Sequence, residues 1–150
     1  MKERFCKFIL VTVASICFAT TSTVGAARSE SKHEELPNFH RVSERLYRGA
    51  QPKRGGIGRL AQLGIKTIVN LRARDIRSQT EEQEARAAGL RYFNVPFERL
   101  GRPTDEQVER VLSIINAQEN QPVLIHCQRD ADRTGTIVAV YRIERDGWTS

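Results

Sequence analysis

A cysteine and an arginine lie six positions apart in this chain, between an apolar segment that reads as a strand and one that reads as a helix. The cysteine, Cys127, follows residues 123–125, and the arginine, Arg133, precedes the apolar residues of 136–145. A loop between a strand and a helix turns backbone N–H groups toward one concavity, to which the helix N-terminus adds partial positive charge. The same field favours a thiolate at the cysteine. The spacing therefore predicts a phosphate-binding loop that carries a nucleophile.

The residue types in this loop match the steps of phosphoryl transfer through a cysteine. A Cys127 thiolate that attacks phosphorus forms a phosphocysteine intermediate, which water then hydrolyses, so one difficult displacement becomes two easier ones. The planar guanidinium of Arg133 can bind two equatorial phosphoryl oxygens, and the Thr134 hydroxyl can donate to the sulfur as it leaves. We expect His126 to shape the loop rather than to transfer protons. The predicted phosphate-binding loop consists of His126, Gln128, Arg129, Asp130, Ala131, Asp132 and Arg133.

The pattern His126-Cys127-(five residues)-Arg133-Thr134-Gly135 resembles the signature loop of the cysteine-dependent protein tyrosine and dual-specificity phosphatases. Residues 46–52 (LYRGAQP) and 64–72 (GIKTIVNLR) resemble the opening segments of bacterial members of that superfamily, so the similarity spans residues 39–148. The resemblance implies a phosphatase that needs no metal and no organic cofactor. Its substrate would be phosphotyrosine in a protein, or a phosphoinositide or other small phosphate ester, which Asp132 favours slightly.

One position of the loop departs from the superfamily. The third residue after the cysteine is usually glycine, whose backbone reaches angles that other residues avoid, but here it is Asp130. Aspartate tolerates the left-handed conformation better than most residues, yet it adds negative charge beside an anion site. We expect weakened phosphate binding, with partial neutralisation of that charge by Arg129. A phosphate-binding pseudophosphatase of low activity is therefore the alternative to a phosphatase.

The general acid that protonates the leaving oxygen is the second departure. In much of the superfamily it is an aspartate on a loop after a strand, shortly before a proline, but the matching residues 94–103 contain no aspartate. Glu98 is one substitute, because a carboxyl group needs only reach and a suitable pKa. Asp132 is another, since an aspartate directly before the signature arginine resembles the myotubularin-type and Sac-type lipid phosphatases, where that position has been assigned an acid role.

Other classes of function fit the residues less well. A rhodanese-like sulfurtransferase also uses a loop cysteine at a strand end, but its loop is typically one residue shorter, and the Arg133-Thr134 register suits phosphate chemistry. The sequence contains no spaced set of cysteine or histidine ligands, which argues against a metal site. The formal net charge of +6 suits an anionic substrate, but the arginines are dispersed, which argues against nucleic-acid binding. Arg72, Arg74 and Arg77 are expected to form a solvated strand exit and loop.

The N-terminal residues have the composition of a secretory signal peptide. Three basic residues precede the apolar run 8–19, and Val24-Gly25-Ala26 supplies small residues for cleavage. We expect residues 1–26 to be removed and the mature chain to be periplasmic or secreted. An uncleaved membrane anchor is the less favoured alternative, because the apolar run is shorter than a bilayer span requires. No stable membrane span is expected after removal of the leader. The other two cysteines fall in this leader, so Cys127 would be the only cysteine of the mature chain.

Strand-like and helix-like patterns alternate along the rest of the chain. Residues 27–38 are polar and are expected to be a disordered lead-in to one phosphatase-like domain over 39–150, which is short at its C-terminal end compared with superfamily members. Strands that alternate with helices predict an α/β fold, with a mostly parallel sheet covered by helices on both faces and a ligand at the carboxyl ends of the strands. The patterns predict an edge strand within 41–48, strands at 65–71, 91–95 and 123–125, and helices at 57–64, 80–88, 104–118 and 136–145.

Overall fold

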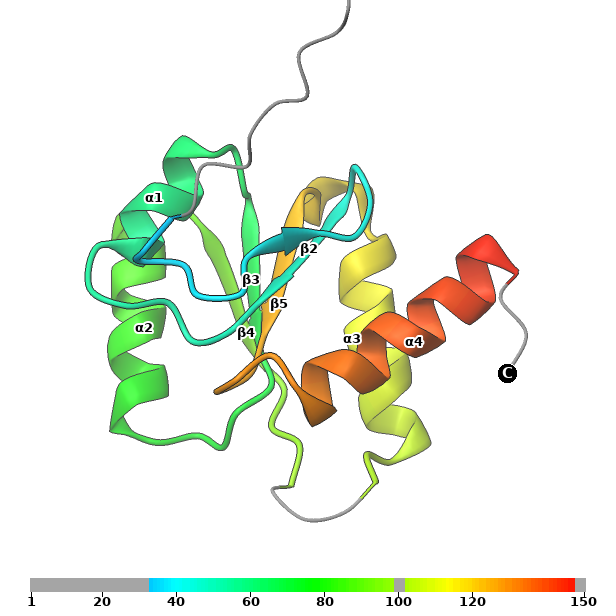
Figure 1. Ribbon diagram of the computed structural model, residues 1–150. Coiled ribbons are helices and arrows are strands. Elements are labelled where there is room, and N and C mark those ends of the chain that lie inside the picture. The colour runs from blue at the N-terminus through cyan, green and yellow to red at the C-terminus, as the bar shows by residue number, and fades with distance from the viewer. Residues whose placement is uncertain (1–32, 99–101, 148–150) are drawn as a thin grey trace, which may run out of the picture. The chain divides into compact units, whose positions relative to one another are not determined.

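A mostly parallel sheet forms the centre of the protein, as predicted. The computed structural model describes residues 33–98 and 102–147 of the chain. Within these residues, five strands form one sheet in the order β1-β2-β5-β3-β4 (Figure 1). The edge strand β1 (His40–Arg41) pairs antiparallel with β2 (Leu46–Gly49). The other neighbours pair in parallel: β2, β5 (Val123–His126), β3 (Thr67–Asn70) and β4 (Arg91–Asn94).

Helices cover both faces of the sheet, which confirms the second part of the predicted fold. α1 (Gly56–Gln62) and α2 (Ile76–Ala87) pack on one face, and α3 (Asp105–Asn116) and α4 (Asp132–Asp146) pack on the other (Figure 1). Successive side chains of a strand point to opposite faces. Ile68 therefore joins the core with α1 and α2, while its neighbour Val69 joins the core with α3 and α4. Strands buried on both faces need continuous apolar runs, which explains residues 123–125.

Two helices begin where side chains satisfy the free N–H groups of the first turn. The Thr104 hydroxyl accepts from Gln107 N at 3.3 Å, and Gln107 Oε1 accepts from Thr104 N at 2.9 Å, which forms a capping box at the start of α3. Asp75 and Ser78 form the same reciprocal arrangement before α2. The sequence prediction misses this second capping box, and its start for α2 at residue 80 is therefore wrong by four residues.

Two other predicted boundaries are also wrong. The expected edge strand within 41–48 is in fact two strands, and β2 lies inside the sheet between β1 and β5. The chain reverses between them because Val42 N and Ser43 N both donate to the Leu46 carbonyl oxygen. Helix α4 begins at Asp132, four residues before the expected start. This second difference places part of the predicted loop inside the first turn of a helix.

The segment before β1 contributes to the core. Residues 33–38, the end of the expected lead-in, form a turn in which Leu36 is buried with Ile57 and Leu60 of α1. The expected signal peptide over 1–26 and the rest of the lead-in lie outside the described residues. Among the helices of the described part, none is long and apolar enough to cross a membrane.

Candidate active site

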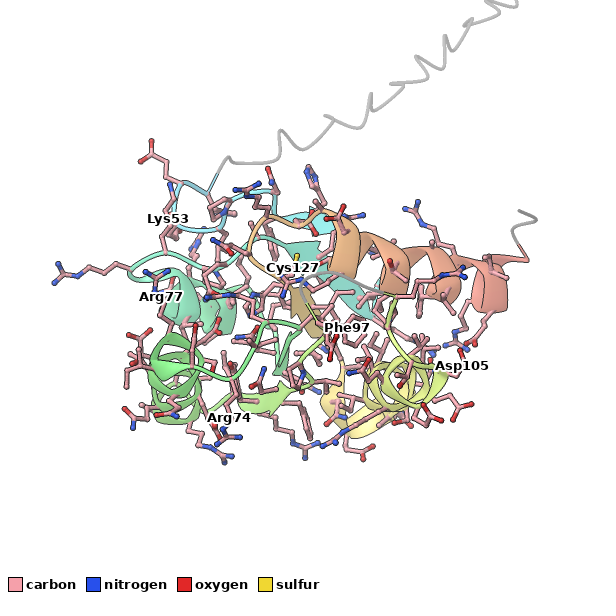
Figure 2. All side chains as sticks on the ribbon, turned by 90° about the horizontal axis from the view of Figure 1, so that it is seen from below. Lys53, Arg74, Arg77, Phe97, Asp105 and Cys127 are labelled. Carbon is pink, nitrogen blue, oxygen red and sulfur yellow. The ribbon has the colours of Figure 1, made fainter. Side chains whose placement is uncertain are left out.

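The carboxyl ends of the four parallel strands meet at one edge of the sheet. Their last residues, Gly49, His126, Asn70 and Asn94, are in register there. The chain leaves β5 at Cys127 and enters α4 five residues later. Figure 2 views the molecule from this side, with Cys127 near its centre. The structure thus places the predicted loop where α/β sheets bind their ligands.

The early start of α4 brings Thr134 and the backbone of the loop around the cysteine. Cys127 is 3% exposed. Burial alone would raise the pKa of its thiol, but hydrogen bonds from the Thr134 hydroxyl and from the backbone N–H groups of Arg129, Thr134 and Ala131 hold the pKa below its usual value. Thr134 Oγ1 is buried without a nitrogen or oxygen partner among the described residues, which leaves this hydroxyl to the sulfur. This is the environment of a reactive thiol.

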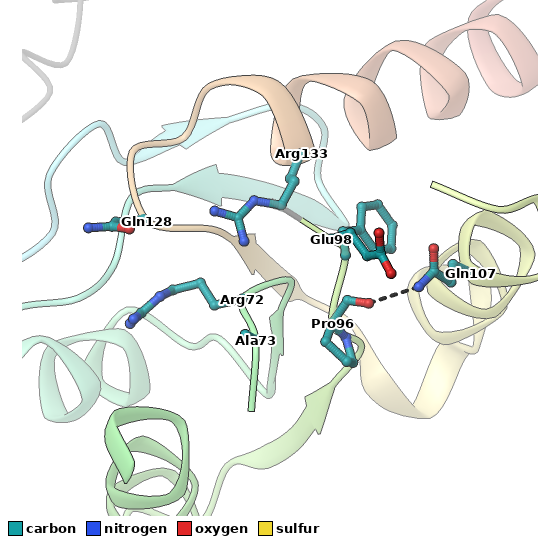
Figure 3. A pocket seen from close by; sticks show the side chains of 8 residues that line it. Arg72, Ala73, Pro96, Glu98, Gln107, Gln128 and Arg133 are labelled. Atoms are coloured by element: carbon teal, nitrogen blue, oxygen red, sulfur yellow. Dashed lines mark hydrogen bonds between the residues drawn. The ribbon is translucent and has the colours of Figure 1, made fainter. Parts of the chain in front are cut away.

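A cavity of about 550 Å³ opens beside the loop, and Arg133 reaches into it from the start of α4 (Figure 3). Its Nη1 donates to the Leu71 carbonyl oxygen at 3.3 Å, which holds the guanidinium at the carboxyl end of β3. A phosphoryl group in this cavity would meet the Arg133 guanidinium. The cavity has two walls, which we call the β3 wall (Arg72, Ala73 and Gln128) and the β4 wall (Pro96, Phe97 and Glu98).

Arg72 is a site residue that the sequence prediction misses by placing it in a solvated loop. It is buried in the structure, and its guanidinium donates to Gln51 Oε1 and, at 3.3 Å, to Asp75 Oδ2. Its backbone N–H donates to Asn70 Oδ1 at 2.7 Å. The signal that would have found it is its place just after the central strand, since residues at that edge line ligand sites.

A buried carboxylate supports the β3 wall from behind, and the sequence prediction misses it as well. Glu81 of α2 accepts hydrogen bonds from Gln51 Nε2 (2.9 Å), Asn70 Nδ2 (2.6 Å) and the Tyr92 hydroxyl (3.1 Å). Its Oε1 also lies 3.0 Å from Nε2 of His126, the residue before the nucleophile. Burial raises the pKa of Glu81, but His126 and the donors outweigh burial, so this pKa lies below its usual value. An ionised Glu81 therefore ties the loop to the β3 wall.

Asp130 has the left-handed backbone expected at the usual glycine position, with a φ of 60°. Arg48 of β2 pairs with its carboxylate at 2.9 Å. Arg129, which was expected to neutralise part of this charge, is exposed, and the Asn38 side chain donates to its carbonyl oxygen. The expectation for Arg129 is therefore wrong, because a residue 82 positions away supplies the positive charge.

The two candidate general acids lie in different surroundings. Glu98 is exposed on the β4 wall and lines the cavity that contains Arg133 (Figure 3). Asp132 is exposed in the first turn of α4, and it is not among the described residues that line this cavity. The geometry therefore favours Glu98 for a group that must reach a bound substrate.

Comparisons with known proteins agree with this site. Residues 14–149 match the model of a family described as a DSP-PTPase phosphatase fused to NAD+ kinase. The dual specificity protein phosphatase TpbA of Pseudomonas aeruginosa is 35% identical over 112 residues, which cover 74% of this chain and 49% of TpbA. The inositol diphosphatase DSP4 of Arabidopsis thaliana is 29% identical over 109 residues, which cover 70% of this chain and 54% of DSP4. The chain thus spans about half the length of these relatives.

A solved structure shares the fold. The core catalytic domain of the PP-IP phosphatase SIW14 from S. cerevisiae matches with a TM-score of 0.69 at 25% identity, over 75% of this chain and 69% of that chain. These relatives are phosphatases, and they do not favour the sulfurtransferase alternative. Because the family model matches most of the chain, and the signature loop with its cysteine and arginine follows β5 at the carboxyl ends of the parallel strands, the chain belongs to the DSP-PTPase family of cysteine-dependent phosphatases.

Proposed function

We propose that this protein hydrolyses phosphate monoesters through a phosphocysteine intermediate. The observation that carries the proposal is the buried Cys127 thiol, whose pKa is lowered by Thr134 and the loop backbone, beside a cavity that Arg133 enters. A lowered pKa increases the fraction of thiolate, which is the attacking form. The Arg133 guanidinium offers two parallel N–H groups to the equatorial oxygens, whose charge it stabilises in the transition state.

The reaction then has two displacements at phosphorus. In the first, the Cys127 thiolate forms a bond to phosphorus, the bond from phosphorus to the leaving oxygen breaks, and that oxygen takes a proton from Glu98. In the second, water attacks the phosphocysteine, Glu98 takes a proton from that water, and the sulfur leaves as a thiolate, which the Thr134 hydroxyl stabilises. Arg133 binds the equatorial oxygens in both steps.

We assign the proton transfers to Glu98 and keep Asp132 as the second candidate. Glu98 shares the cavity with Arg133, whereas Asp132 lies outside the lining of that cavity in the described structure. A general acid must come within hydrogen-bond reach of the leaving oxygen, directly or through one water. The position of Glu98 on the wall opposite Arg72 meets this condition for an ester that enters between the two walls.

The substrate that we propose is a phosphate ester with more than one anionic group. A second cavity of about 540 Å³ adjoins the first, because Arg72 and Gln128 line both. Lys53, Arg54 and Arg77 also line the second cavity, and with Arg72 they outnumber its two acids, Glu81 and Glu84. Figure 2 shows Lys53 and Arg77 on the same side of Cys127. This charge supports a phosphoinositide or another small phosphate ester over an isolated phosphotyrosine. Phosphotyrosine in a protein remains the second candidate, since TpbA is named a protein phosphatase.

We also propose that the protein is exported to the periplasm or secreted. The support is the order of basic, apolar and small residues within 1–26. Fractionation of cells that express the full chain with a C-terminal tag checks this proposal. We expect a shortened product outside the cytoplasm, and an unshortened product in the cytoplasmic fraction would contradict it.

Hydrolysis of p-nitrophenyl phosphate by the full chain, without added metal, tests the catalytic proposal. Cys127→Ser should abolish turnover because an alcohol at this site is not ionised at neutral pH. The matched control is the double change Cys6→Ser and Cys17→Ser, the same substitution in the predicted leader, which should leave turnover unchanged. A folded wild-type chain that binds tungstate but does not turn over the ester would instead support the pseudophosphatase alternative.

A further inference from the structure

Arg48 and Asp130 join the phosphate-binding loop to strand β2. Arg48 Nε lies 2.9 Å from each of the two carboxylate oxygens of Asp130, and Arg48 Nη2 donates to the Asp130 carbonyl oxygen at 2.8 Å. One guanidinium therefore binds both the side chain and the main chain of the same residue. The Asp130 side chain is 6% exposed and the Arg48 side chain 25%, so salt screens the pair less than a pair on the surface.

The contact to the main chain fixes the backbone around the nucleophile. Asp130 has a φ of 60°, a left-handed conformation that is unfavourable for a residue with a Cβ atom. The residues on either side of it, Arg129 and Ala131, direct backbone N–H groups to the Cys127 sulfur. By holding the carbonyl group between them, Arg48 sets the direction of the groups that must surround a bound phosphate.

The contact to the carboxylate removes a charge that would oppose the substrate. An unpaired carboxylate three residues after Cys127 would repel both the thiolate and an anionic ester. Burial raises the pKa of Asp130, and the hydrogen bond and positive charge of Arg48, with smaller contributions from His40 and His126, lower it only in part. Pairing with Arg48 therefore neutralises this position when Asp130 is ionised, and protonation neutralises it when it is not.

We propose that Arg48 is a positioning residue that clamps Asp130, so that an acidic residue can occupy the usual glycine position of the loop without repelling the bound phosphate. The inference rests on the proposed function of the loop as a phosphate site. In the described structure, neither Arg48 nor Asp130 lines the cavity that Arg133 enters, so the clamp acts through the loop and not by contact with the substrate.

Binding of tungstate to the full chain, measured by calorimetry with Cys127→Ser in every variant, tests the clamp. This background removes the titrating thiol and needs no turnover, so failure of the proposed chemistry and failure of the clamp are distinguishable. Arg48→Met should weaken binding about tenfold or more, since a charged hydrogen-bonded pair contributes about 1.5–3 kcal/mol. Arg45→Met, at an exposed arginine next to the same strand, is the matched control and should bind like the parent.

Removal of the carboxylate should rescue the loss of its partner. Arg48→Met combined with Asp130→Asn should bind tungstate within about threefold of the parent, because asparagine tolerates the left-handed backbone and carries no charge. If the double variant binds as weakly as Arg48→Met alone, neutralisation of the Asp130 charge is not what Arg48 supplies, and the proposal is overturned. A sharp gain in affinity from Asp130→Gly alone would also overturn it, since the charge would then not have been neutralised.

The pH dependence supplies a signature that a merely structural role would not produce. In Arg48→Met, tungstate binding should strengthen as the pH falls, because protonation of the unpaired Asp130 removes its charge. Because His40 and His126 also interact electrostatically with Asp130, the double variant with Asp130→Asn is needed to isolate the contribution of the aspartate. Thermal unfolding confirms that each variant is folded. If Arg48→Met does not fold, Arg48→Lys keeps the charge without the paired contacts and should bind at an intermediate affinity; parental affinity in that variant would contradict the clamp.

Discussion

The two walls of the catalytic cavity are built in different ways. Behind the β3 wall, Arg72 is held by Gln51, Asn70 and Asp75, and the buried Glu81 joins that group to the loop through His126. The β4 wall ends at the exposed Glu98, and Gln107 Nε2 donates a hydrogen bond to its Pro96 carbonyl oxygen (2.9 Å, Figure 3).

This difference separates the binding of phosphate from the handling of the leaving group. Groups that stabilise developing charge are most effective when they are held in place before the substrate arrives, and buried hydrogen bonds hold the loop and Arg72 in this way. A general acid instead needs to reach the leaving oxygen, whose position depends on the ester, and this suits a carboxyl group on the less constrained wall, such as Glu98. The comparison indicates that damage to the β3 wall should affect folding and binding, whereas damage to the β4 wall should affect turnover.

Glu81→Ala should break the β3 wall and produce the largest change in stability. It removes the acceptor shared by Asn70 and Tyr92 and leaves His126 without its buried partner. A buried donor that loses its acceptor costs about 1–3 kcal/mol, and several donors lose theirs here, so the total loss should be about 3 kcal/mol or more. Urea denaturation measures this change. Glu84→Ala, at an exposed position of the same helix, should stay within about 0.5 kcal/mol of the wild type, and an equal loss in both variants would count against the network.

Glu98→Gln should change turnover without changing stability. With phenyl phosphate, a poor leaving group, we expect kcat to fall on the order of 100-fold, because the leaving oxygen no longer receives a proton. With p-nitrophenyl phosphate, whose leaving group needs little protonation, the loss should be much smaller. Asp132→Asn is the matched comparison and should show no such dependence on the leaving group. If the two variants exchange these patterns, Asp132 is the acid.

The pH dependence of stability should distinguish the two walls by a smaller effect. The pKa of Glu81 in the folded protein lies below its usual value. Its ionised carboxylate therefore stabilises the fold at pH values above the usual pKa, and this stabilisation is lost as the pH falls through the folded-state pKa. The free energy of unfolding of the wild type should therefore decline under acid conditions. Glu81→Gln should make that decline shallower, and Glu98→Gln should leave it unchanged. Denaturant titrations across acid pH measure both, and identical curves for all three proteins would remove the distinction.

Gln107→Ala should produce the smallest effect of these changes, and it tests how strongly the β4 wall is constrained. The change removes the hydrogen bond to the Pro96 carbonyl oxygen and half of the Thr104 capping box. Each such bond contributes about 1 kcal/mol, so stability should fall by about 1–2 kcal/mol. Activity with p-nitrophenyl phosphate should fall by less than in Glu98→Gln with phenyl phosphate. A loss as large as that of Glu81→Ala would show that the two walls are equally constrained.

Local patterns predicted much of this protein. The β-branched residues within 65–71 and the continuous apolar run 123–125 correctly indicated strands, which the structure buries on both faces, and the Cys127–Arg133 spacing correctly placed the loop after the second of them. The start of α4 was wrong because residues 132–135 carry no apolar periodicity, although their backbone is helical. The catalytic roles of Cys127, Arg133, Thr134 and Glu98 stay predictions, since activity measurements decide them.

The sequence by itself determined the reactive loop, the alternation of strands and helices and the family, because these depend on residues close together along the chain. The tertiary structure decided which distant residues complete the site. Arg48 meets Asp130 because β2 lies beside β5, and Glu81 meets His126 because α2 covers the face where β3 and β5 are neighbours. The order of strands in a sheet depends on how the whole core packs, and no local pattern of side chains encodes it. Partners that this order brings together are therefore absent from the sequence pattern, even when they hold the nucleophile in place.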